Sequence, residues 1–279
     1  MAFIRWMIVV LSVVFLTTLA INAADTIDTP GSSLIGAAIG ALDAPPCPED
    51  MVLVSMSGGD VCVDRYEAST SDTCPYQDPM SKRETDDNLS LDSCVPESVA
   101  NQKPWRNISR QQAELACARV GKRLPSNSEW YRASLGTPDK NIGWGKEDCN
   151  VHTSAEAPDT TGSRANCRSA AGAYDMIGNV WEWLEETVVE DKYIDTAFPD
   201  AGYVTNIDAR GIPIGTDAVN PDDAFFRDYF WLEGETVRGM LRGGYWRSKS
   251  DAGQYALNVT VPPSFVGTAV GFRCVKDAN

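Results

Sequence analysis

The chain has a single histidine, His152, and few basic residues: 24 lysines and arginines stand against 39 acidic residues, for a formal charge of −15. One histidine cannot build a multi-histidine metal centre, and a Ser-His-Asp triad would depend wholly on that side chain. The acidic balance argues against nucleic acid and anionic membranes as partners. It is compatible with divalent cations, although an acidic surface also serves solubility, so charge alone assigns no function.

Long apolar runs are absent after the N-terminus. Arg5 precedes the uncharged residues 6–24, with small residues around Ala23. This pattern is typical of a cleaved signal peptide at residues 1–23; the alternative is an uncleaved anchor, because the run is nearly long enough to span a bilayer. Residues 24–46 are rich in small residues and proline, which predicts a linker. Both alternatives place residues 47–279 outside the cytoplasm (periplasmic, secreted or in a secretory-pathway lumen), with membrane contact only through an uncleaved N-terminal segment.

No Cys-X-X-Cys pair occurs, which removes the usual support for a zinc site or a dithiol redox motif. The eight cysteines are Cys47, Cys62, Cys74, Cys94, Cys117, Cys149, Cys167 and Cys274. An even number of cysteines in an exported chain predicts disulfides. Eight cysteines allow about 105 pairings, and the spacing alone leaves that choice open.

Two capping boxes predict short helices. Ser109 with Gln112 begins the first, which should end at Gly121, and Ser126 with Glu129 begins the second. Short apolar or alternating runs predict strands, which are residues 51–54, 61–63, 180–184, 241–246 and 270–275. Two polar, acidic stretches have no useful period. We expect residues 69–98 to form a long surface loop and residues 190–238 a surface insertion in the domain.

Four motifs follow one another in the second half of the chain. They are residues 116–126 (ACARVGKRLPS) with the Glu-Trp at 129–130, residues 174–183 (YDMIGNVWEW), residues 241–244 (LRGG) and residues 271–274 (GFRC); an opening block, CVDRYE, occupies residues 62–67. In this order they resemble the formylglycine-generating enzyme, or sulfatase-modifying factor, family across about residues 47–279. The resemblance implies an α+β, C-type-lectin-like fold. Such a fold has little regular secondary structure, short antiparallel strands, two or more helices and disulfide staples.

The resemblance implies one disulfide, because relatives join the cysteine of the helix motif to that of the closing motif. Here these are Cys117 and Cys274. Proximity along the chain then favours the pairs Cys47–Cys62, Cys74–Cys94 and Cys149–Cys167.

Calcium is the cofactor that the resemblance implies. Relatives use the Gly-Asn-x-Trp-Glu segment as a calcium loop, and the matching positions are Asp175, the carbonyls of Gly178 and Val180, and Glu182. A carboxylate at each end with glycine between can wrap a hard cation with oxygen ligands. A second site would begin at Asn150 and Val151. The alternative is that Asp175 and Glu182 only cap turns and hydrogen-bond to the backbone.

The residues that carry out the oxidation in the family are absent from this chain. Those enzymes hold copper through two cysteines soon after the Gly-Gly, because soft thiolates hold Cu(I), but residues 245–255 contain no cysteine. We therefore expect no copper. The iron-dependent sulfoxide synthases, a related branch, need several histidines, so we expect no iron. A third branch acts in pyoverdine maturation outside the cytoplasm. No feature of the sequence shows whether the chain belongs to this branch or to one of the others.

Two functions remain. The first is a recognition module without oxidase activity that binds a protein, peptide or glycan. Its candidate surface is Tyr245, Trp246, Arg247, Tyr255 and Phe265, with Asn258 nearby, since aromatic and arginine side chains dominate contact energies. The alternative for Tyr245 and Trp246 is a place in the core of a strand. The second function is an extracytoplasmic enzyme that modifies peptides or siderophore precursors; no catalytic residue is predicted for it.

Overall fold

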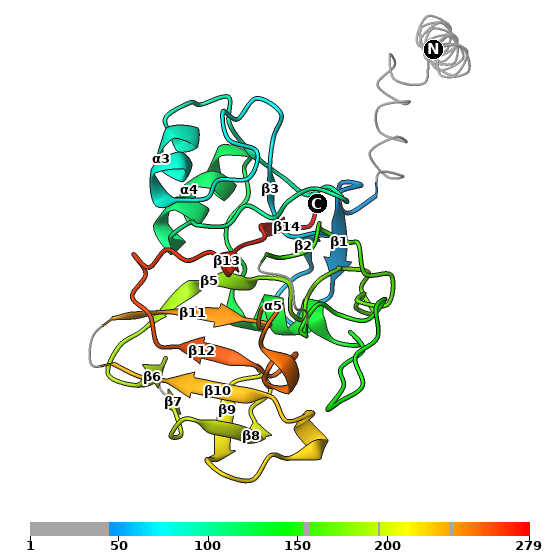
Figure 1. The fold of residues 1–279 in the computed structure, drawn as a ribbon, viewed down its shortest axis with the longest axis vertical. Coiled ribbons are helices and arrows are strands. Elements are labelled where there is room, and N and C mark those ends of the chain that lie inside the picture. Colours follow the sequence, from blue (N-terminus) through cyan, green and yellow to red (C-terminus); the bar gives the residue numbers. More distant parts are fainter. Residues whose placement is uncertain (1–44, 153–156, 195, 235–236) are drawn as a thin grey trace, which may run out of the picture. The chain divides into compact units, whose positions relative to one another are not determined.

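The computed structural model describes residues 45–152, 157–194, 196–234 and 237–279. The expected signal peptide and nearly all of the expected linker lie outside the described residues. The chain divides into residues 1–46 and a compact unit, Cys47–Asn279, that begins at the first cysteine. In the described part of this unit, short strands and three α-helices are joined by long irregular segments (Figure 1). No described helix is long and apolar enough to cross a bilayer.

A small antiparallel sheet joins the two ends of the unit. Its strands are β1 (Met51–Val54), β2 (Val61–Asp64) and β14 (Val275–Asp277), in the order β1-β2-β14. The first two pair as an antiparallel hairpin, and both were among the strands predicted from the sequence. The last strand of the chain pairs along β2, with Val275 opposite Val63, and both valines are fully buried. The sheet therefore anchors the C-terminus beside the first strands of the domain.

A seven-stranded sheet forms the rest of the framework. Its order is β13 (Val270–Gly271), β5 (Trp181–Val188), β11 (Arg238–Arg242), β12 (Leu257–Val259), β10 (Tyr229–Leu232), β8 (Gly202–Ile207) and β9 (Pro213–Asp217). Most neighbours are antiparallel, but β13 runs parallel to β5 and β10 runs parallel to β12. Strands β11, β12 and β10 lie side by side in Figure 1. Phe230 and Leu257, partners on β10 and β12, are fully buried in the larger apolar cluster.

The two capping boxes begin helices where the sequence predicts them. Helix α4 (Arg110–Arg119) starts after Ser109, and α5 (Asn127–Ser134) starts after Ser126, each with both hydrogen bonds of the box. Helix α4 buries Cys117, and α5 buries Trp130. The remaining short elements are β3 (Ser69–Thr70), β4 (Pro96–Glu97), β6 (Lys192–Tyr193), β7 (Thr196–Ala197) and the 3-10 turns η1 (Asp223–Phe225) and η2 (Lys249–Asp251).

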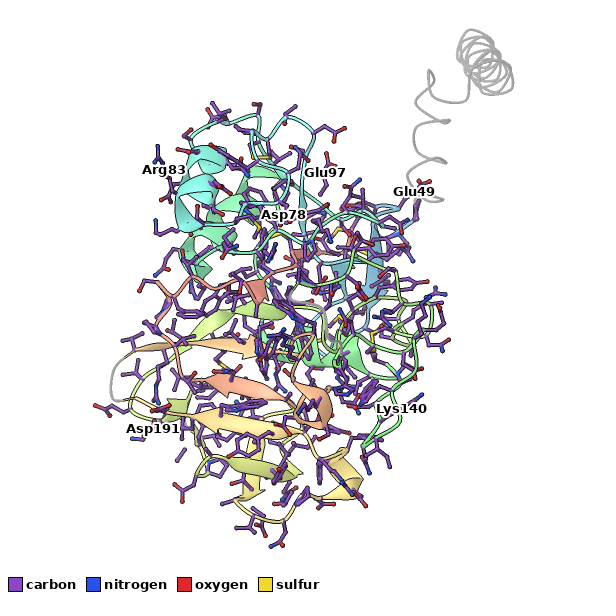
Figure 2. All side chains as sticks on the ribbon, in the orientation of Figure 1. Glu49, Asp78, Arg83, Glu97, Lys140 and Asp191 are labelled. Atoms are coloured by element: carbon purple, nitrogen blue, oxygen red, sulfur yellow. A yellow bond between two sulfur atoms is a disulfide. The ribbon has the colours of Figure 1, made fainter. Side chains whose placement is uncertain are left out.

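Two expectations about the acidic stretches are wrong. Residues 69–98 contain helix α3 (Lys82–Leu89), which buries only the polar Thr85 and Asn88 and therefore shows no apolar period. Residues 190–238 are not a surface insertion, because they supply β8, β9 and β10 to the large sheet and bury Val204 and Phe230 completely. Charged side chains such as Asp191 and Arg83 nevertheless project from the outside of the unit (Figure 2).

Four disulfides join all eight cysteines. The pairs are Cys47–Cys62, Cys74–Cys94, Cys117–Cys274 and Cys149–Cys167, the same pairs that resemblance and proximity favour. The third links helix α4 to the residue just before β14, across a separation of 157 residues. No cysteine is free. Four disulfides fit a protein of an oxidising, extracytoplasmic compartment.

Candidate functional site

Glu182 of β5 forms a buried ion pair with Arg273 of the closing motif. The Nε of Arg273 lies 2.7 Å from Oε2 of Glu182, and its Nη2 lies 2.6 Å from Oε1. The indole Nε1 of Trp130 donates to Oε2 at 2.6 Å. Both side chains of the ion pair are at most 1% exposed. The two hydrogen bonds join the guanidinium to the carboxylate in the bidentate geometry that gives strong, directional pairs. Both oxygens of Glu182 are therefore already engaged.

Two more buried carboxylates lie close to this pair. Glu67, just after β2, accepts hydrogen bonds from the backbone N–H of Val180 at 3.1 Å and from the side-chain amide of Asn179 at 2.5 Å. Asp175 accepts one from the N–H of Gly162 at 2.6 Å. Both carboxylates are at most 2% exposed. The sequence had not singled out Glu67 or Asn179 as site residues, although both lie inside the motifs that carry the resemblance.

The three carboxylates carry more negative charge than the single guanidinium among them can balance. Burial raises the pKa of Asp175 to about 7, and the charge of Glu182 adds to that rise. Burial also raises the pKa of Glu67 well above its usual range, with the charges of Asp175 and Glu182 adding to the effect, while Arg273 opposes it. An excess of buried negative charge favours either a proton or a cation at this place.

The two segments expected to bind calcium lie in contact. The N–H of Asn179 donates to the carbonyl of Asn150 at 2.9 Å, and the amide of Asn150 donates to Oδ1 of Asn179 at 3.1 Å. Gly178, at φ +76°, comes so near that a Cβ there would lie 2.3 Å from the Asn150 carbonyl oxygen. Oδ1 of Asn150 is buried and has no hydrogen-bond partner in the described part of the chain. The carbonyl of Val151 accepts a hydrogen bond from Lys249.

This donor set fits calcium in part. The side-chain oxygens of Asp175 and Asn150 are hard donors of the kind that calcium prefers, and the excess negative charge favours a cation. Among the described residues, however, no three histidine, cysteine, aspartate or glutamate side chains gather closely enough to hold a metal ion. Glu182 is engaged by Arg273. An ion at this loop would therefore depend on Asp175, Asn150 and the backbone carbonyls of Gly178 and Val180.

The candidate recognition surface is only partly a surface. Trp246 is 4% exposed, and its backbone N–H donates to the carbonyl of Asn179, so it lies in the core beside the carboxylate cluster. Tyr245 is half-buried and meets Trp246 edge to face, with ring centroids 5.3 Å apart. Arg247 is exposed. For Trp246, the alternative of a core position is therefore the one observed.

The other two candidate residues pack elsewhere. Tyr255 is half-buried, and its ring lies 5.2 Å from Phe225 and 6.2 Å from Tyr131, against the larger apolar cluster. Tyr245 instead packs against the second apolar cluster, which surrounds the Cys117–Cys274 disulfide. Phe265 is 37% exposed.

A second pair of acidic groups, Asp139 and Asp228, has no signal in the sequence. Asp139 accepts a hydrogen bond from the N–H of Gln254 at 3.2 Å, and Asp228 accepts one from the next amide, Tyr255, at 2.7 Å. Burial raises the pKa of Asp139 to about 7. Burial and then the charge of Asp139 raise the pKa of Asp228 well above its usual value. The two groups come from segments far apart in the sequence, which is why no local pattern shows them.

Comparison with known proteins finds a match to one family model. Residues 56–278 match the model of the sulfatase-modifying factor enzyme 1-like domain. The chain is 32% identical over 162 residues to the serine/threonine-protein kinase Pkn1 of Chlamydia trachomatis serovar L2, covering 57% of this chain and 22% of that protein. It is 31% identical over 139 residues to the formylglycine-generating enzyme of Thermomonospora curvata, covering 44% of each. The solved structure of PvdO from Pseudomonas aeruginosa superposes with a TM-score of 0.43 at 15% identity, over 84% of this chain and 96% of that one.

The chain spans less than half the length of either of these curated relatives. The family model nevertheless covers almost the whole compact unit. The observed architecture, an α+β arrangement of short, mostly antiparallel strands with four disulfides, confirms the C-type-lectin-like fold that the motifs imply. The chain belongs to the sulfatase-modifying factor enzyme 1-like domain family.

Proposed function

We propose that this chain is an extracytoplasmic recognition module that does not perform the thiol-dependent oxidation of its family. The carrying observation is the state of its cysteines. All eight are paired, and the segment of residues 245–255 contains none. A Cu(I) centre needs soft thiolate ligands, and a sulfur atom in a disulfide is not a thiolate. The segment instead presents the exposed Arg247 beside the half-buried Tyr245.

Labelling of thiols tests the carrying observation. The purified protein is denatured without reductant and treated with a maleimide, and its intact mass is measured. We expect no adduct before reduction and eight after it. An adduct on the unreduced protein, above the level of incomplete oxidation, would restore thiol chemistry as a possibility and contradict the proposal.

Binding to arrays of peptides and glycans tests the recognition role itself. Any class of peptide or glycan that binds the parent protein should bind the variant Arg247→Ala more weakly, because exposed arginine side chains contribute strongly to recognition. The matched control is Arg83→Ala, which removes an exposed arginine from α3. If no class of peptide or glycan binds the parent protein, or if both variants lose binding equally, this surface is not the recognition site.

We also propose structural calcium at the loop that carries Asp175, Gly178 and Val180, with Asn150 from the neighbouring segment. The excess negative charge of the carboxylate cluster and the unpaired Oδ1 of Asn150 support it. Calcium should raise the midpoint of thermal unfolding relative to EDTA. The variant Asp175→Asn should shrink that rise, whereas Asp72→Asn, at an exposed position, should leave it unchanged. No difference between calcium and EDTA would refute this proposal.

An extracytoplasmic enzyme that modifies peptides or siderophore precursors is the competing proposal. The pair of Asp139 and Asp228 favours it, because carboxyl groups with raised pKa values recur at catalytic sites. Incubation with such substrates should then give a mass change that Asp139→Asn abolishes. If no substrate changes in mass, the recognition role is favoured.

A further inference from the structure

A polar cavity of about 400 Å³ lies beside the carboxylate cluster, between three segments of irregular chain. Its basic lining residues are Lys103, Lys146 and Arg164, one from each segment. Thr160 and Ser163 add hydroxyl groups to the lining. Three cations around one cavity are unexpected in a chain with a formal charge of −15, so the cavity differs in sign from the protein as a whole.

The charges of this cavity are only partly balanced from within. Arg164 is committed to Asp159, with Nε and Nη2 at 2.7 and 2.6 Å from Oδ2. Lys103 and Lys146 have no acidic partner within salt-bridge distance in the described residues, and Glu147 is the other acidic side chain in the lining. The lining therefore has a formal excess of one positive charge. The two lysine ammonium groups and the hydroxyls can donate hydrogen bonds to a ligand.

The walls of the cavity are tied together by backbone hydrogen bonds. Asn101 donates to the carbonyl of Thr161, and Thr161 donates to that of Gln102, each at 2.8 Å. Asn166 donates to the carbonyl of Glu147 at 2.9 Å. The disulfide Cys149–Cys167 closes the loop between the second and third segments. Gly162, in the third segment, is held by Asp175. The cavity is thus preorganised, which lowers the entropic cost of binding.

We propose that this cavity binds a tetrahedral oxyanion, a sulfate or phosphate ester carried on a group the size of one sugar. Lysine binds such oxyanions as a point charge, and the hydroxyls of Thr160 and Ser163 can donate to the remaining oxygens. The cavity is large enough for the ester and its ring. This inference rests on the proposed recognition role and adds to it a ligand site whose lining does not include Arg247.

Calorimetric titration of the purified chain with three matched probes tests the proposal. Glucose 6-sulfate or glucose 6-phosphate, or both, should bind, whereas uncharged glucose should not. The double variant Lys103→Ala and Lys146→Ala should lower the affinity for the charged sugar about tenfold or more, because it removes two charge-assisted contacts. The control Lys192→Ala removes an exposed lysine from β6, outside the lining, and should change nothing.

Preference for the sulfate probe would assign sulfated ligands, and preference for the phosphate probe phosphorylated ones; both support the site. Binding of glucose as tight as that of the charged sugars, or an unchanged affinity in the double variant, would overturn it. Circular dichroism of each variant checks the fold. If the charged sugars do not bind but the protein still binds ligands on the arrays, only the cavity proposal is refuted. If the purified protein contains a bound redox metal, the proposed function is refuted and the cavity proposal is not.

Discussion

Replacement of Arg273 by methionine is expected to destabilise the domain severely. The guanidinium is fully buried and makes two hydrogen bonds to the carboxylate of Glu182. It also donates to the carbonyls of Asp64 and Tyr174, at 2.9 and 2.8 Å. Methionine fills part of the volume but supplies no charge and no donor, so the substitution leaves Glu182 with a buried charge and only the indole of Trp130 as a donor.

The expected loss of unfolding free energy is about 3 to 5 kcal/mol, the cost of removing one partner from a buried ion pair. A domain of this kind has a total stability of about 5 to 15 kcal/mol, so the variant Arg273→Met should be close to unfolding. The companion variant Glu182→Gln removes the charge that Arg273 balances. The double variant should then lose about 1 to 3 kcal/mol less than the sum of the two single variants, as for residues in direct contact.

Urea denaturation under oxidising conditions, followed by tryptophan fluorescence, measures the four free energies of this cycle. If Arg273→Met does not fold, Arg273→Lys keeps the charge and loses the bidentate geometry, and it replaces methionine in the cycle. Additive free energies would refute the assignment of Glu182 to Arg273.

Three further predictions concern stability. Changing Cys117 and Cys274 to serine opens a loop of 157 residues and should cost about 5 kcal/mol by chain entropy; a loss below about 1 kcal/mol in urea unfolding would contradict this. Gly178→Ala should give little folded protein, because its Cβ would lie 2.3 Å from the Asn150 carbonyl oxygen at a φ of +76°; a normal yield of folded protein would count against that contact. Burial raises the pKa of Asp139 from 3.8 to about 7, so the folded state binds more protons and its contribution to stability falls as pH rises through that window. Asp139→Asn should therefore lose less stability than the parent between about pH 4 and 7, and equal slopes in urea unfolding would refute it.

Helices α4 and α5 and the two strands of the first hairpin could be predicted because their signals are local, whereas α3 was missed. Ser109 and Ser126 each begin a helix through contacts within one turn, and the two strands of the hairpin are joined by a short turn rich in glycine. The surrounding strands needed distant partners. Strand β10 pairs with β12, more than twenty residues later, as Phe230 opposite Leu257, and its acidic flanks hide it in the sequence.

The candidate site divides in the same way. Asp175 and Glu182 belong to one motif, so the sequence identifies both as candidate site residues. Their neighbours come from elsewhere: Glu67 lies more than one hundred residues earlier, and Arg273 lies ninety-one residues after Glu182. Only the fold shows that Arg273 engages Glu182, since separation along the chain says nothing about which carboxylate a buried guanidinium will meet.

The metal content of the purified protein tests the central claim most directly. The chain is expressed with its N-terminal segment, recovered from an oxidising compartment without chelator or affinity metal, and analysed by inductively coupled plasma mass spectrometry. We expect stoichiometric calcium, and neither copper nor iron above trace, because all eight cysteines are in disulfides and the chain has one histidine. Stoichiometric copper or iron that resists dialysis would contradict it.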